Sequence, residues 1–118
     1  MDSPWTVTFY ESDEEGCAVQ SFLDSLDNKR RAKVLAMIRL LEEPGPTLPF
    51  PYSSQVRGKI RELRAHYGDE HYRVLYFGAP RRVFVLLHAF EKRTAQVRER
   101  HVRLAEGRMS RFLREDRT

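Results

Sequence analysis

Basic side chains are concentrated around three predicted strands in the second half of the sequence. Arg64 ends the run Lys-Ile-Arg-Glu-Leu-Arg, Arg73 opens a second run, and a Lys-Arg pair at 92–93 follows a third. A short turn joins the first two runs, so we expect Arg64 and Arg73 to be cross-strand neighbours. Like charges placed there destabilise a sheet unless an opposite charge lies close. The pattern therefore predicts either an anion site or a lattice of structural ion pairs to Glu62 and Glu91.

Proton transfer near neutral pH requires a group that titrates there, and arginine does not. Arg64, Arg73 and Arg93 are therefore expected to stabilise negative charge rather than to accept protons. Lys92 becomes a candidate base if the guanidinium groups of Arg64 and Arg93 lower its pKa. His88 titrates in a suitable range. It lies in an apolar strand, however, where a core histidine with satisfied hydrogen bonds is the competing interpretation.

Further cations flank these positions and extend the surface that a polyanion would contact, because phosphates are bound mainly by Lys and Arg. We expect RNA contacts from Lys59, Arg61, Arg82 and Arg98. No metal and no cofactor are expected. The four histidines share no metal-ligand spacing, and the sequence has neither a phosphate-binding glycine loop nor a nucleophile elbow.

The first half of the chain predicts one strand and two helices. Residues 5–10 are β-branched and aromatic, as in a strand. Ser12 and Glu15 have the spacing of a capping box, which predicts that a helix follows directly. A second helix is expected to begin at Asp27 or Asn28 and to end near Glu43. Prolines then predict a dozen residues without regular structure.

The second half predicts three strands and a final helix. The strands cover 59–65, 72–77 and 83–90, and the last of them is apolar on both faces, so it should lie inside the sheet. A helix follows Thr94, with an apolar stripe at Val97, His101, Leu104, Ala105, Arg108 and Phe112. The order β-α-α-β-β-β-α predicts an α+β domain with a small antiparallel sheet and helices packed on one face.

The length of 118 residues allows one domain over residues 1–118, with a core over about 5–108 and a C-terminal helix end that frays. No apolar stretch reaches the ~20 residues of a membrane span. The acidic N-terminus has no apolar region typical of a signal peptide. These features exclude a membrane protein and predict a cytoplasmic one.

Charge is unevenly distributed between the two halves of the chain. Residues 1–56 contain 5 Lys/Arg and 9 Asp/Glu, a net charge of −4, whereas residues 57–118 contain 16 and 8, a net charge of +8. A basic region of this size attracts polyanions and speeds their encounter. The alternative is an incidental bias, since arginine outnumbers lysine 17 to 4.

Three segments in this order carry a resemblance to a known family. Residues 59–64, 72–77 and 86–94 closely resemble the HigB and phage-derived branch of RelE-like toxins. The resemblance extends from about residue 5 to about residue 108. Each short motif has little specificity alone, but three in order, in a chain of the matching size and element order, are a strong signal.

The resemblance implies the toxin of a type II toxin–antitoxin system. Such toxins are ribosome-dependent endoribonucleases that cut mRNA through the RNA's own 2′-hydroxyl and need no metal. The implied partners are the ribosome, mRNA and a helix-turn-helix antitoxin. Carried over residue by residue, the site falls on Arg64, Arg73, Lys92 and Arg93. Many relatives place a tyrosine near the start of the last helix; this chain has none there, and Glu99 and His101 are the nearest titratable substitutes.

Two other functions compete with the nuclease. One is a non-enzymatic toxin on the same fold, either inactive or poisoning gyrase as the ParE branch does. ParE-like chains lose the basic set that this chain keeps, which favours the nuclease. The other is a generic RNA-binding domain, which would need exposed aromatic side chains among the charges. Its candidates, Tyr72, Tyr76 and Phe77, occupy strand positions that are better explained as core.

Overall fold

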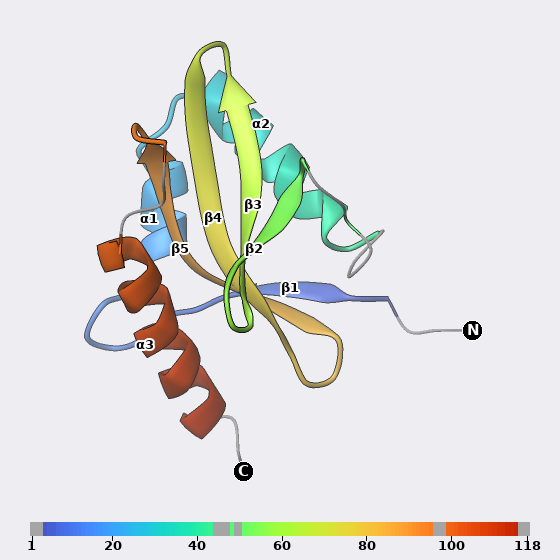
Figure 1. The fold of residues 1–118 in the computed structure, drawn as a ribbon, viewed down its shortest axis with the longest axis vertical. Coiled ribbons are helices and arrows are strands. Elements are labelled where there is room, and N and C mark those ends of the chain that lie inside the picture. The colour runs from blue at the N-terminus through green and yellow to red at the C-terminus, as the bar shows by residue number, and fades with distance from the viewer. Residues whose placement is uncertain (1–3, 44–47, 49–50, 96–98, 116–118) are drawn as a thin grey trace.

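The computed structural model describes residues 4–43, 48, 51–95 and 99–115 and confirms the predicted α+β class (Figure 1). The elements are, in chain order, β1 (Thr6–Phe9), α1 (Ala18–Asp24), α2 (Asn28–Leu40), β2 (Ser53–Arg57), β3 (Ile60–Tyr67), β4 (Glu70–Ala79), β5 (Val83–Lys92) and α3 (Glu99–Glu115).

The strands form one five-stranded sheet in the order β1-β5-β4-β3-β2. β5 lies between two neighbours, as its apolar sequence predicts. β2 to β5 run antiparallel to one another, whereas β1 pairs with β5 in parallel. The expectation of an antiparallel sheet is therefore wrong at one edge, where β1 and β5 are separated in the chain by two helices and three strands rather than joined by a hairpin.

One strand was not predicted. β2 pairs with β3, with a bulge between Gln55 and Arg57, in a stretch where the prolines predicted no regular structure. Its sequence, Ser-Ser-Gln-Val-Arg, contains one apolar residue, and the strand occupies a sheet edge where one row of hydrogen bonds suffices. Pairing with β3 therefore decides its conformation, because intrinsic strand preference depends strongly on context. Residues 44–47 and 49–50 of the proline-rich loop lie outside the described residues.

Helices cover both faces of the sheet, not one face as predicted (Figure 1). The first core packs α1 and α2 on one face, with Val19, Leu23, Val34 and Ile38 buried against Leu63, Val74 and Leu86. The second core packs α3 on the other face, with Ala105, Met109 and Phe112 against Leu75, Phe77 and Leu87. The sheet is buried on both sides because β4 and β5 are apolar at consecutive positions, and such strands need two covering layers.

The start of α1 differs from its prediction, whereas the start of α2 agrees. Ser12 Oγ accepts a hydrogen bond from the Glu15 backbone N–H at 3.0 Å, but this closes a turn beside the Ser12–Gly16 bridge. α1 begins later, at Ala18. Asp27 caps α2 by accepting from the Arg30 backbone N–H at 2.9 Å, as expected. A capping motif thus also fits a tight turn.

α3 continues beyond residue 108, the predicted end of the core. It extends to Glu115, and the ring of Phe112 packs edge-on against Phe77 with centroids 6.0 Å apart. Leu104, placed in the apolar stripe by its spacing, is 42% exposed instead; Val97 lies outside the described residues. In the described part of the chain, no helix combines the length and apolar character needed to cross a bilayer.

Candidate functional site

Arg64 of β3 and Arg73 of β4 lie directly opposite each other, as the short turn predicted. Strand alternation places both on the sheet face that α3 covers, because Arg73 is also opposite Phe90 of the second core. Glu62, two residues before Arg64, shares this face. The structure therefore brings two cations and one carboxylate together beside the end of the sheet that α3 leaves uncovered.

Glu62 pairs with both arginines, but in unequal ways. Its Oε1 accepts from Arg64 Nε at 3.1 Å and from Ser54 Oγ at 3.2 Å. Its Oε2 lies 3.6 Å from Arg73 Nε, and neither of these two buried atoms has a hydrogen-bond partner. Arg73 is 6% exposed and Glu62 5%. Burial, and then the nearby Arg64, lower the pKa of Arg73, while Glu62 opposes the shift.

Lys92 ends β5 opposite His71, on the same face as Arg73. Its Nζ donates to the backbone carbonyl of Ala95 at 2.9 Å. The pKa of Lys92 is lowered, first by burial, then by Arg73 and Arg64, with Glu62 acting in the opposite direction. The pKa of Lys92 is therefore lowered as predicted, but the arginines that lower it are Arg73 and Arg64 rather than Arg93 and Arg64.

The remaining predicted cations are dispersed. Arg93 is exposed and pairs with Glu91 at 3.3 Å. Arg61 points to the opposite face, where its Nε donates to Ser53 Oγ at 3.1 Å. Lys59 and Arg82 lie in the β2–β3 and β4–β5 turns.

Both turns lie at the far end of the sheet. Arg82 is roughly 33 Å from Lys92 along β5, at about 3.3 Å per residue. Arg98 lies outside the described residues. The predicted RNA contacts of these flanking cations thus remain predictions, and the structure gathers only Arg64, Arg73 and Lys92 around one point.

His88 faces α3 rather than the basic cluster. Its Nε2 lies 2.8 Å from Nδ1 of His101 in the first turns of α3. Burial, followed by the charge of Arg108, lowers the pKa of His88 to about 4. A histidine with this pKa is neutral at physiological pH and is already engaged at both ring nitrogens, by Arg108 and by His101. The geometry favours the core-histidine interpretation.

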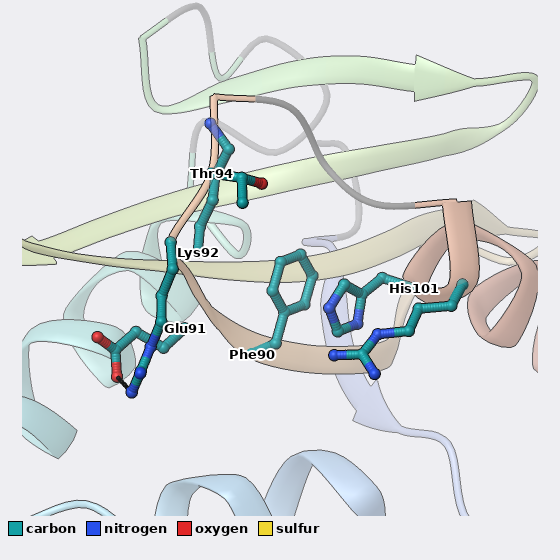
Figure 2. A pocket seen from close by; sticks show the side chains of 7 residues that line it. Phe90, Glu91, Lys92, Thr94 and His101 are labelled. Atoms are coloured by element: carbon teal, nitrogen blue, oxygen red, sulfur yellow. Dashed lines mark hydrogen bonds and ion pairs between the residues drawn. The ribbon is translucent and has the colours of Figure 1, made fainter.

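Two adjoining pockets flank the end of β5. One, of about 410 Å³, is lined by Phe90, Glu91, Lys92, Arg93, Thr94, Arg100 and His101. The other, of about 420 Å³, shares the 91–94 segment and adds Asp69, Glu70, His71 and Arg73. Figure 2 shows the first pocket, with the rings of Phe90 and His101 side by side and Lys92 and Thr94 extending from the strand end. The basic cluster therefore opens onto a continuous hollow rather than an isolated cavity.

Sequence reasoning did not assign His71, His101 or Arg100 to the site. A period of two along β3 and β4 places His66 and His71 on the face of Arg64 and Arg73 and was available from the sequence. The sequence named His101 as part of the stripe of the last helix and as a substitute for a tyrosine, but not as a site residue. Glu99, the other substitute, is bound by Arg57 at 2.8 and 2.9 Å.

Three aromatic residues of β4 lie near this site but are buried. Tyr72, Tyr76 and Phe77 are at most 2% exposed, so they are core residues and not a stacking surface for bases. Within the described ranges, no cluster of three or more His, Cys, Asp or Glu side chains could hold a metal ion.

Comparison with known proteins places the chain in a family. No curated protein matches it significantly. Residues 21–110 match the family model described as phage derived protein Gp49-like (DUF891), which covers well over half of the chain and most of the described elements. That family is one of RelE-like, toxin-like proteins, and a toxin of this kind implies an antitoxin partner. The resemblance to HigB in particular is not carried by this match. The chain belongs to the phage-derived Gp49-like family of toxin-like proteins.

Proposed function

We propose that the chain is the toxin of a type II toxin–antitoxin pair and an endoribonuclease that cleaves mRNA on the ribosome. The observation that supports this most is the group formed by Arg64, Arg73 and Lys92, which share one sheet face around Glu62. Within this group three cations face one carboxylate, and Arg73 and Lys92 line an open hollow whose other lining residues include Arg93 and the carboxylates of Asp69, Glu70 and Glu91. A phosphodiester is the ligand that such a site fits, because its oxygens accept from planar guanidinium groups.

The proposed reaction is an in-line transfer at phosphorus. The 2′-oxygen forms a bond to phosphorus while the bond from phosphorus to the 5′-oxygen breaks, which yields a 2′,3′-cyclic phosphate and a 5′-hydroxyl. Lys92, with its lowered pKa, accepts the 2′-hydroxyl proton. Arg64 and Arg73 stabilise the charge that develops on the phosphoryl oxygens. The leaving oxygen receives a proton from solvent or from the ribosomal environment.

Dependence on the ribosome follows from how few groups the site supplies. In the described part of the chain, the cluster itself offers Lys92 as a candidate base, and its carboxylate, Glu62, is paired with arginine. Enzymes that lack part of the acid–base set rely on positioning of the substrate for much of their rate. A ribosome that holds the codon in a bent geometry would supply that positioning. Free mRNA should therefore be cut far more slowly than mRNA in programmed ribosomes.

The proposal is tested by replacing Lys92 with arginine, which keeps the charge and removes the base. Single-turnover cleavage on programmed ribosomes should fall about 10²–10⁴-fold. The matched control is Lys29→Arg, an exposed residue of α2 on the other face of the sheet. That variant should cleave at the wild-type rate.

The outcomes of this experiment separate the alternatives. Wild-type cleavage by Lys92→Arg would show that Lys92 acts by charge alone and that the base lies elsewhere. Growth arrest without new mRNA ends would reject the nuclease and favour a non-enzymatic or gyrase-poisoning toxin. DNA supercoiling measured in the same cells distinguishes those two.

We propose that the partner is a helix-turn-helix antitoxin that presents acidic residues to the Arg64, Arg73 and Lys92 cluster or blocks its approach to the ribosome. The net charge of +8 over residues 57–118 supports electrostatic steering. The association rate should then fall steeply as salt increases. Stopped-flow association over a range of salt concentrations is the measurement, and a flat dependence contradicts the steering.

A further inference from the structure

Glu62, the carboxylate at the centre of the basic cluster, has no role in the proposed chemistry. It is 5% exposed and shares one sheet face with Arg64 and Arg73. Its Oε1 accepts from Arg64 Nε at 3.1 Å and from Ser54 Oγ at 3.2 Å, and it lies 3.0 Å from Arg64 Nη2. Its Oε2 is buried and accepts no hydrogen bond. The carboxylate is therefore anchored through one oxygen only.

The contact between Oε2 of Glu62 and Arg73 is an ion pair without a hydrogen bond. Oε2 lies 3.6 Å from Arg73 Nε, and both atoms are buried without a hydrogen-bond partner. Two polar atoms have thus lost their hydration on folding and gained no hydrogen bond in exchange, which costs free energy. Among the described residues, Arg73 is held by the charge of Glu62 and by one hydrogen bond, from its Nη1 to the Tyr72 carbonyl at 3.0 Å.

Two arginine–glutamate pairs elsewhere in the fold are closed by hydrogen bonds. Arg30 makes three hydrogen bonds of 2.7–3.2 Å to Glu70. Arg108 makes two to Glu15, of 2.8 and 3.2 Å. Each of these pairs joins elements that lie far apart in the sequence, whereas the pair in the basic cluster joins two strands that already share a backbone ladder. The fold therefore depends less on this pair than on the other two.

Arg73 lies between Glu62 and the hollow at the end of β5. Its side chain lines that hollow of about 420 Å³ together with Lys92, whereas Glu62 is not among the lining residues. An anion in the hollow therefore meets Arg73 directly, with the charge of Glu62 behind it. Lys92 is affected by the same carboxylate, because burial and then Arg73 lower its pKa and Glu62 opposes that shift. Glu62 thus acts on both cations of the cluster that face the hollow.

We propose that Glu62 is a built-in counter-ion that weakens the binding of phosphate to Arg73 and so limits the affinity of the site for RNA that nothing else holds in place. A phosphate in the hollow offers Arg73 the hydrogen bonds that Glu62 does not, because its oxygens can approach the planar guanidinium. The same phosphate is repelled by the carboxylate, which Arg64 and Ser54 hold in place. Glu62 is a positioning residue that acts through Arg73 and touches no substrate.

This balance discriminates between free RNA and RNA held on the ribosome. One unit charge roughly 7 Å away lowers the affinity for an anion about tenfold, which disfavours free RNA. A phosphate that the ribosome holds in position is presented at a high effective concentration and binds despite that repulsion. The identity of the anion as RNA and this part of the ribosome rest on the proposed function. The counter-ion role of Glu62 does not.

Glu62→Gln tests the inference, because it removes the charge and keeps the shape of the side chain. A short 2′-deoxy oligonucleotide, which cannot be cleaved through a 2′-hydroxyl, should bind this variant about tenfold more tightly than the wild type. Glu62→Asp keeps the charge and should bind within about threefold of the wild type. Glu42→Gln makes the same change in net charge at an exposed position just after α2 and is the matched control, which should bind as the wild type does. Unchanged or weaker binding by Glu62→Gln overturns the inference, because that is the result expected if Glu62 only holds Arg73 in place.

A second measurement keeps the test decisive if Glu62→Gln loses stability, since the change leaves the buried Arg73 without a carboxylate. Inorganic phosphate should raise the Tm of Glu62→Gln more than that of the wild type, at an ionic strength matched with sodium chloride. The reason is that the anion then replaces the missing counter-ion and binds the folded state. Adding Arg73→Met to Glu62→Gln should remove most of this extra shift. Equal shifts for Glu62→Gln and the wild type overturn the inference.

Cleavage kinetics provide a readout that a purely structural role would not produce. With free mRNA, the KM of Glu62→Gln should fall about tenfold while kcat does not rise, because the gain lies in binding alone. Failure of the inference is also distinguishable from failure of the proposed nuclease. If Glu62→Gln binds the oligonucleotide more tightly while the wild type leaves mRNA on programmed ribosomes intact, the counter-ion role stands and the nuclease is rejected. If the wild type cleaves that mRNA and Glu62→Gln binds no more tightly, the nuclease stands and the counter-ion role is rejected.

Discussion

Two arginines, Arg73 and Arg108, are buried against carboxylates on the same face of the sheet, yet their surroundings differ. Arg108 donates to Glu15, Leu87 and His88, so its guanidinium is bound along three sides. Among the described residues, the guanidinium of Arg73 donates to the carbonyl of Tyr72 alone, and its Nε faces Glu62 at 3.6 Å without a hydrogen bond. One arginine is saturated and the other is not.

The difference separates a structural role from a proposed chemical one. A buried guanidinium with its hydrogen bonds complete stabilises the elements that it joins, here α3, β5 and the segment after β1. A buried guanidinium with donors in reserve retains a desolvation cost that an incoming anion would relieve. Burial also lowers the pKa of Arg73, which reflects the same cost. An unsatisfied buried polar group in a native protein calls for an explanation, and a catalytic role is one of those known.

The largest expected effect is loss of stability in Arg108→Met. The change leaves Glu15 with only the exposed Arg111 and removes the donor to Leu87 and His88, so the free energy of unfolding should fall by about 3 kcal/mol. Urea denaturation monitored by circular dichroism measures it. Arg111→Met, which removes the exposed partner of the same carboxylate, is the control and should cost much less. Equal losses would mean that saturation does not distinguish the two arginines.

The next effect is loss of activity in Arg73→Met with little change in stability. Cleavage on ribosomes should fall about 10²–10³-fold, as for the loss of one charge stabiliser. Arg64 still binds Glu62, so the free energy of unfolding should fall by only about 1–2 kcal/mol.

Arg73→Lys sharpens that result, because it keeps the charge without the planar fork and should restore activity only in part. Arg39→Met, an exposed change on α2, is the matched control for an arginine-to-methionine replacement and should cleave normally. A stability loss for Arg73→Met as large as that of Arg108→Met, with cleavage at the wild-type rate, would make Arg73 a structural residue.

The smallest effect is a pH dependence of stability that comes from His88. Its pKa falls from 6.5 to about 4 on folding, so the unfolded chain takes up a proton below pH 6.5 that the folded chain refuses. Stability should therefore decrease as pH falls from 6.5 to 4, by about 1–2 kcal/mol for a partly exposed group. Denaturation of wild type and His88→Gln over this range isolates the contribution. Parallel curves for the two proteins would contradict a neutral His88 held by Arg108.

The amino-acid pattern determined most elements of the fold. Helix-start signals predicted two helices after the first strand, and the doubly apolar 83–90 segment located an interior strand, because burial on both faces requires apolar residues at consecutive positions. β2 was not predicted, because an edge strand made mostly of polar residues lacks the apolar pattern by which strands are found in a sequence. The position of α3 on the opposite face of the sheet was not predicted. An apolar stripe indicates that one side of a helix is buried, but it does not indicate which face of the sheet that side packs against.

The candidate site divides in the same way. Sequence alone determined that Arg64 and Arg73 are neighbours, since a short antiparallel hairpin fixes which residues oppose each other. It could not determine that Arg73 Nε lacks a hydrogen-bond partner while Arg108 donates to Glu15, Leu87 and His88. Nor could it determine that His88 faces His101 rather than the basic cluster. Those features depend on contacts between residues as far apart as Glu15 and Arg108. Only the packing of α3 across the sheet brings these side chains within hydrogen-bond distance, and hydrogen bonds require geometry that no spacing along the chain specifies.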